Sequence, residues 1–118
     1  MSRYILLLHN PKDYLFSAMS PDDIQRVVEG HRAWIERQRE HGRLLASDQL
    51  ADSGRSLVAD GSGVSAKDGP YSEGKEVIGG YYVIEAAGYD EAEAIARDLV
   101  VLGAHRWTTE IRELVEFD

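Results

Sequence analysis

The chain has 118 residues, of which 29% are charged, and a formal net charge of −8. The length predicts a single domain over residues 1–118, and the acidic balance argues against a nucleic-acid backbone as the main partner. No apolar run approaches the ~18 residues of a membrane span. The N-terminus lacks the pattern of a secretion signal, so we expect a cytoplasmic protein that does not bind membranes.

The first part of the chain predicts a strand followed by a long helix. Residues 3–8 contain a continuous apolar run, as a buried central strand does. Ser20 and Pro21 predict a helix start, because Ser caps free N–H groups and Pro fits the first turn. Gly42 ends the helix near residue 41. The apolar face of the helix consists of residues at helical spacing: Ile24, Val27, Val28, Trp34 and Ile35.

The charged residues of this helix are expected mainly on its solvated side. Opposite charges three residues apart favour local ion pairs, which give ordinary support to a helix in solvent. The expected pairs are Glu29 with Arg32, Glu36 with Arg39, and Arg37 with Glu40.

The rest of the chain predicts more strands and a second helix. Asp90 is the expected N-cap of this helix, and Glu93 stands in the capping-box position. Loose alternation of apolar residues and turn-forming residues predicts the strands. They cover residues 44–51, 55–59, 64–67, 77–86 and 107–117.

The order of these elements predicts an α+β fold. It corresponds to a ferredoxin-like sandwich with an inserted β-hairpin. In such a fold the helices cover one face of the sheet, and the other face is apolar and needs a partner. We therefore expect a homodimer.

The stretch from Lys67 to Tyr82 combines a tight turn, clustered charges and two glycines. Gly69 tolerates positive φ, and Pro70 fixes its own φ, so residues 68–70 predict a rigid bend. Gly79 and Gly80 interrupt an apolar strand, which indicates a β-bulge or close approach of another group. Two interpretations of the bend remain open. It is either a structural turn or a turn that borders a ligand cleft.

Asp68-Gly69-Pro70-Tyr71, followed by charged residues and an apolar strand, resembles the DGPF motif of YCII-related proteins. Tyr71 replaces the Phe that is usual in this motif. The resemblance spans nearly the whole chain, and includes Arg112 on the closing strand, where Glu113 replaces the usual Pro. It implies a ferredoxin-like fold that dimerises through its sheets into an α/β barrel. The biochemical role of the family is mostly undefined.

His31 is the main candidate for chemistry. It lies on the apolar side of the first helix, where a polar group is costly unless it is hydrogen-bonded. It is either a hydrogen-bonded core residue or a neutral imidazole that acts as general base or acid in a pocket. In its spacing to residues 43–45 it resembles the helix histidine to which catalysis is ascribed in the wider YCII superfamily. Asp48 and Asp68 are the candidates for its acidic partner.

The resemblance also implies further site residues within the motif and on the last strand. Carboxylates near a histidine divide acid and base roles if their environments separate their pKa values, or they form salt bridges at a dimer edge. Arg112 either clamps a ligand carboxylate or pairs with Glu110 or Glu85. The catalytic candidates are therefore His31 and Asp68. The substrate-binding candidates are Asp48, Tyr71, Glu73, Lys75 and Arg112.

Several kinds of chemistry are disfavoured by missing motifs. The chain has no Cys, no glycine-rich phosphate loop and no Gly-x-Ser-x-Gly. His9, His41 and His105 lack metal-ligand spacing, so we expect neither metal nor cofactor. The first hypothesis is cofactor-free acid–base chemistry on a small molecule near His31 and Asp68. The alternatives are a non-catalytic dimer that binds a small ligand or accompanies transcription regulators, as DGPF-type domains do, and a purely structural dimer.

Overall fold

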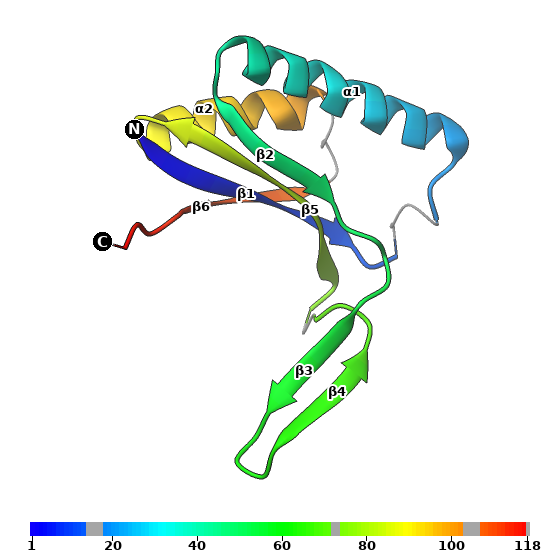
Figure 1. Ribbon diagram of the computed structural model, residues 1–118. Helices are drawn as coiled ribbons and strands as arrows, with labels where there is room; N and C mark the ends of the chain where they lie inside the picture. Colours follow the sequence, from blue (N-terminus) through cyan, green and yellow to red (C-terminus); the bar gives the residue numbers. More distant parts are fainter. Residues whose placement is uncertain (14–17, 72–73, 103–106, 118) are drawn as a thin grey trace.

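The computed structural model describes residues 1–13, 18–71, 74–102 and 107–117 (Figure 1). The order of helices and strands predicted from the sequence is confirmed. The elements are β1 (Ser2–Pro11), α1 (Pro21–Glu40), β2 (Leu44–Gln49), β3 (Arg55–Ala59), β4 (Val64–Asp68), β5 (Glu76–Ala86), α2 (Tyr89–Leu102) and β6 (Thr108–Glu113).

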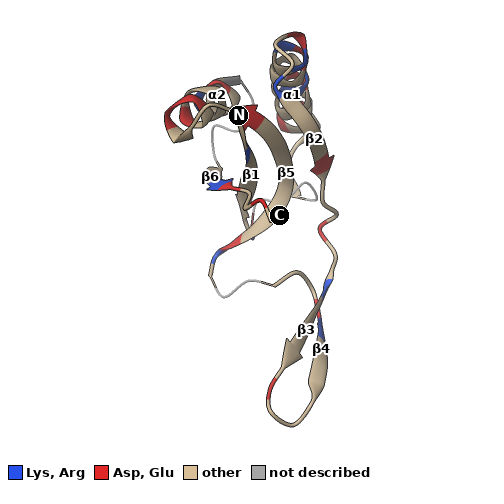
Figure 2. Cartoon of the chain, turned by 60° about the vertical axis from the view of Figure 1, so that its left-hand side comes forward, with Lys and Arg blue, Asp and Glu red and all other residues tan. Residues whose placement is uncertain are grey.

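Four of the strands form an antiparallel sheet in the order β2-β5-β1-β6. Both helices lie on the same side of this sheet (Figures 1 and 2). The α+β class and the ferredoxin-like arrangement are therefore confirmed. Among the described residues, neither helix has both the length and the apolar character needed to cross a membrane.

The core lies between the sheet and the two helices. Burial alternates along β1, so that Tyr4, Leu6 and Leu8 face the helices. Trp34 of α1 is fully buried, and its indole N–H donates to the Ile95 carbonyl of α2 at 3.0 Å. Each fully buried side chain of this size contributes about 1.5–3 kcal/mol through the hydrophobic effect. This packing fixes α1 over the sheet.

The face of the sheet away from the helices, here called the open face, carries apolar side chains at its centre. Ile5 and Leu7 on β1 point to it, and Val83 of β5 lies opposite Ile5. All three are only half-buried within one chain. At its border His9 Nε2 lies 2.7 Å from a carboxylate oxygen of Glu110. An apolar centre with a polar border is typical of a surface that binds another protein.

The helix ends agree with the sequence at α1 but not at α2. The Asp23 N–H donates to Ser20 Oγ at 3.1 Å, as predicted for the N-cap of α1. The prediction that Asp90 caps α2 is wrong, because the helix begins one residue earlier, at Tyr89. Glu91 is therefore the third helical residue, and its carboxylate accepts the Ala87 N–H at 3.2 Å. Glu93 instead pairs with Arg97.

Gly79 and Gly80 form a β-bulge, as the sequence predicted. Leu8 pairs with Gly80 and His9 pairs with Ile78, so Gly79 is an extra residue on β5. A Cβ at Gly79 would lie 2.3 Å from Asn10 Nδ2, and one at Gly80 would lie 3.2 Å from the Asp48 carbonyl oxygen. Both interpretations of these glycines, a bulge and a close approach, are confirmed.

The β3–β4 hairpin extends away from the sheet and from both helices (Figures 1 and 2). Its apolar side chains are exposed, with Leu57 at 71% and Val64 at 68% of full exposure. The Gly69 N–H donates to the Gly54 carbonyl at 2.7 Å, with Gly69 at φ 97°. Residues 68–70 therefore close the base of the hairpin. The radius of gyration is 15.9 Å, above the ~13.5 Å expected of a compact domain of this length.

Candidate functional site

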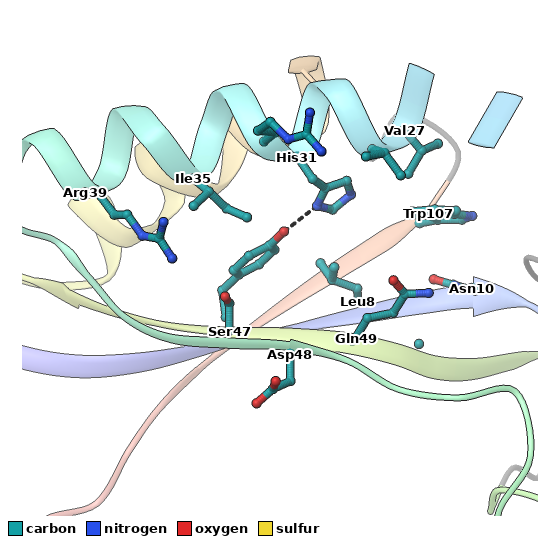
Figure 3. Close-up of a pocket in the computed structure, with 15 residues that line it drawn as sticks. Leu8, Asn10, Val27, His31, Ile35, Arg39, Ser47, Asp48, Gln49 and Trp107 are labelled. Carbon is teal, nitrogen blue, oxygen red and sulfur yellow. Dashed lines mark hydrogen bonds between the residues drawn. The ribbon is translucent and has the colours of Figure 1, made fainter. Parts of the chain in front are cut away.

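A cleft of about 490 Å³ lies between α1 and the helix-facing side of β1, β2 and β5 (Figure 3). We call it the His31 pocket. Its volume is within the ~300–1,000 Å³ that small-molecule sites usually have. It is lined by Leu8, Asn10, Val27, Val28, His31, Arg32, Ile35, Arg39, Ser47, Asp48, Gln49, Gly79, Gly80, Tyr82 and Trp107.

His31 and Tyr82 form a pair of polar side chains in this pocket. His31 Nδ1 lies 2.5 Å from the Tyr82 hydroxyl oxygen, and the rings stack with centroids 5.8 Å apart (Figure 3). Helical spacing from Val28 turns His31 toward the sheet, and the alternation of β5 turns Tyr82 toward the helix. Trp34 packs against Tyr82 with centroids 4.6 Å apart. His31 is partly exposed and borders the cleft, while its Nε2 atom is buried, so both the core and the pocket interpretation stay open.

Burial raises the pKa of Tyr82 to about 12. Its hydroxyl therefore keeps its proton at neutral pH. When Nδ1 of His31 carries a proton, it donates to the Tyr82 oxygen, and Nε2 has a lone pair that accepts a proton. The Tyr82 O–H then remains available as a donor. The pair can thus supply both a base and a hydrogen-bond donor.

We expect the Tyr82→Phe variant to lose less stability than the wild type when the pH rises above 10. Below pH 10 the Tyr82 hydroxyl is protonated in both the folded and the unfolded chain. Between pH 10 and about 12 only the unfolded chain releases this proton, because the folded pKa is raised. The free energy of unfolding should therefore fall across this window, by about 1–2 kcal/mol for Tyr82 after solvent screening.

Denaturant melts of both proteins at pH 8, 10 and 11.5 measure this difference. Tyr4 and Tyr81 also have raised pKa values, so the quantity of interest is the difference between wild type and Tyr82→Phe. Parallel loss of stability in the two proteins would show that Tyr82 does not titrate differently in the folded chain.

The remainder of the His31 pocket is mostly apolar. Leu8, Val27 and Ile35 form its walls, and Trp107 lies at one end (Figure 3). Near Trp107, Asn10 is only 4% exposed, and its side-chain oxygen has no hydrogen-bond partner in the part of the chain that the structure describes. A ligand or water in the pocket can satisfy this oxygen.

Two arginines of α1, which the sequence placed mainly on the solvated side of the helix, border the pocket. Among the described residues, neither Arg32 nor Arg39 forms an ion pair. The predicted pairs with Glu29 and Glu36 are therefore wrong. A cleft lies beside this side of the helix, so Arg39 extends toward the sheet instead of along the helix surface (Figure 3).

Neither predicted acidic partner of His31 directs its carboxylate into the His31 pocket. Asp48 borders the pocket, but its carboxylate points away from it (Figure 3) and accepts the Tyr81 hydroxyl at 2.8 Å. This bond raises the pKa of Tyr81. The side chain of Asp68 is 98% exposed, near Arg55 on the hairpin. Within one chain the structure does not bring Asp68 to His31.

The predicted substrate-binding residues are also spread over the molecule. Tyr71 is 69% exposed and Lys75 is exposed, and neither lines the His31 pocket. Arg112 lies opposite Ile5 and belongs to the open face. Among the described residues it forms no ion pair with Glu110 or Glu85. Glu73 lies outside the described residues.

Sequence reasoning did not select Tyr82, Asn10, Arg32 or Arg39 for the site. A signal for the arginines exists: Val28, Arg32, Ile35 and Arg39 follow each other at steps of four, three and four. These steps place all of them on one side of a helix. For Tyr82 the signal is alternation with Ile84, which is buried under the helices.

No group of three or more His, Asp or Glu side chains within the described ranges could hold a metal ion. The polar groups that the pocket offers to a ligand are an imidazole, a phenol, amides and guanidinium groups. These groups bind, orient and transfer protons, and the neutral imidazole is the natural base among them.

Two comparisons with known proteins agree with one another. The family model described as YCII-related domain matches residues 2–118. An uncharacterised protein of Rhizobium meliloti (strain 1021) is 30% identical over 113 residues, which cover 94% of this chain and 90% of the relative. The range matched by the family model includes every residue that lines the His31 pocket.

Proposed function

The chain belongs to the family of proteins with a YCII-related domain, whose function is undefined, and from this premise we propose that it performs cofactor-free proton transfer on a small molecule in the His31 pocket. His31 is the base, and Tyr82 is its hydrogen-bond partner. The observation that carries the proposal is the 2.5 Å contact between these two side chains within a cleft of ligand size.

The proposed step is an isomerisation or elimination that begins with removal of a proton. Nε2 of His31 takes a proton from a substrate carbon next to a carbonyl group. The Tyr82 hydroxyl accepts a hydrogen bond from the Nδ1 proton, so it holds the imidazole in the tautomer in which Nε2 is the base. The proton then returns to another carbon of the same molecule, or a leaving group departs and accepts the proton from His31, so that the imidazole is neutral again. Neither route consumes a cofactor.

A screen of small metabolites followed by isotope exchange tests the proposal. Ligands that bind the folded chain raise its melting temperature. Each such ligand is then incubated with the protein in D₂O, and exchange of its acidic C–H protons is followed by NMR. Enzyme-dependent exchange supports proton transfer. Binding of several ligands without any exchange favours the alternative, a ligand-binding or regulatory dimer.

We also assign the chain to the DGPF type within the family. The support is the sequence Asp68-Gly69-Pro70-Tyr71 at the base of the β3–β4 hairpin. Gly69 and Ser56 meet there, since the Ser56 hydroxyl donates to the Gly69 carbonyl at 3.1 Å. This arrangement favours the interpretation of the motif as a structural turn over that of a cleft border.

We further propose that two copies pack through the open face. A half-buried apolar centre at Ile5, Leu7 and Val83 supports this, because water contacts with such a surface are costly. The exposed apolar hairpin is a second support, since an isolated two-stranded hairpin is marginally stable in water. An interface of more than ~1,000 Å² in total is expected.

Light scattering should therefore give twice the chain mass of 13.2 kDa at micromolar concentration. We expect Leu7→Glu to shift the mass to that of a monomer, because it adds a charge to the centre of the open face. Val101→Glu, on α2 at a position 80% exposed, is the matched control and should remain dimeric. A monomeric wild type would contradict the proposal.

A further inference from the structure

We propose that the ligand of the His31 pocket is a small carboxylic acid with an apolar body, and that Arg39 binds its carboxylate. This inference rests on the proposed function and adds the substrate class to it. It depends on three features of the pocket: the charges on its border, the apolar walls, and the order of groups along its length.

The charge on the border of the pocket is positive. Arg32 and Arg39 both line it, and neither forms an ion pair among the described residues. Other arginines of the same helix do pair: Arg26 with Asp23, and Arg37 with Asp98 at 3.5 Å.

Asp48 is the only acidic residue that lines the pocket within the described part of the chain, and its carboxylate points to the other side of the sheet (Figure 3). The Tyr81 hydroxyl holds it there at 2.8 Å. The two guanidinium groups are therefore not neutralised from within the pocket. The chain as a whole has a net charge of −8, but these two arginines make the pocket locally positive, so the pocket favours an anionic ligand.

The walls of the pocket specify the rest of the ligand. Val27, Val28, Ile35 and Leu8 are apolar, and Trp107 closes one end. Inorganic phosphate or a similar fully hydrated ion would leave these walls in contact with water. A carboxylic acid with an alkyl or aryl body covers the walls and supplies one planar anion to an arginine.

The order of groups along α1 gives the ligand a direction. Arg39 lies eight residues after His31, which is about 12 Å along a helix. Figure 3 shows Arg39 on the side of the pocket toward Ser47, and Trp107 and Asn10 on the opposite side of His31. A carboxylate at Arg39 therefore places the middle of the ligand beside His31 and Tyr82, and its apolar end near Trp107.

Two probes of equal shape test the inference, namely 3-phenylpropionate and its neutral counterpart 3-phenylpropionamide. Dissociation constants are measured by calorimetry for wild type, Arg39→Gln and Arg97→Gln. Arg97 lies on α2, outside the pocket, so Arg97→Gln changes the net charge of the chain by the same amount as Arg39→Gln without altering the pocket. We expect wild type and Arg97→Gln to bind the carboxylate roughly tenfold more tightly than the amide, and Arg39→Gln to lose most of this preference.

Three outcomes would overturn the inference: equal affinity of wild type for both probes, no binding of either probe at 10 mM, and an undiminished preference in Arg39→Gln. None of them bears on proton transfer. A neutral ligand from the screen whose exchange in D₂O requires His31 would support the proposed function while excluding a carboxylic acid. Conversely, a carboxylate preference that depends on Arg39, without any exchange, would support the ligand class alone.

Discussion

Gly80→Val is expected to lower the melting temperature by roughly 10 °C or more, whereas Gly61→Val should change it by no more than a few degrees. A Cβ at Gly80 would lie 3.2 Å from the Asp48 carbonyl oxygen and 3.7 Å from Leu8 Cδ1. That carbonyl belongs to the neighbouring strand, so it moves only if β2 moves. Extra atoms in such a tightly packed place cost about 1–3 kcal/mol, and in a domain of this size each kcal/mol corresponds to several degrees.

Gly61 is the matched control because it undergoes the same change at the tip of the hairpin. Nothing lies within 4 Å of a Cβ at this position. Thermal melts followed by circular dichroism at equal protein concentration measure both variants. Equal melting temperatures would mean that β2 and β5 adjust to a side chain at Gly80, and the argument from close approach would then fail.

His31→Ala is expected to abolish isotope exchange into the ligand and to cost little stability. General acid–base groups contribute about 10²–10⁴-fold to rate, so exchange should fall by at least about 100-fold. His31 is partly exposed and borders an open cleft, so water can replace the imidazole and hydrogen-bond to Tyr82. The free energy of unfolding should therefore change by less than about 1 kcal/mol.

Denaturant melts and the exchange assay together decide the role of His31. A loss of about 2–4 kcal/mol, with no ligand found in any screen, is the result expected of a core residue, and it would defeat the catalytic interpretation. His41→Ala is the control for exchange. This histidine follows the end of α1, is exposed, and lies outside the His31 pocket.

Local signals in the sequence were sufficient for the elements and for their order. The continuous apolar run of residues 4–8 predicts the central strand β1, and Ser20 and Gly42 mark the ends of α1, because each of these effects acts within a few residues. The first residue of α2 was predicted wrongly, because Asp90 suits an N-cap as well as the first turn in which it lies.

The chemistry of the site was harder to predict, because it depends on which segments become neighbours. The face to which Asp48 points is set by its pairing with Tyr81, 33 residues away. Likewise, Arg37 and Arg39 have different roles because they face different neighbours. Arg37 forms an ion pair with Asp98 of α2, whereas Arg39 lines the His31 pocket. Neither relation is visible in local spacing. The predicted histidine, in contrast, lies in the pocket because its helical face is determined locally.

The tip of the β3–β4 hairpin offers a place for a spectroscopic label. Asp60 accepts the N–H and the hydroxyl of Ser62 at 2.9 and 2.7 Å, so the turn holds its own shape. The chain contains no Cys, and a cysteine introduced at Gly61 would be its single thiol. A dye or spin label attached there would lie at the tip of the β3–β4 hairpin, far from the helix α1 that carries His31 (Figure 1). The separation between two such labels would measure how two copies are arranged, while ligand binding could be followed in the same sample.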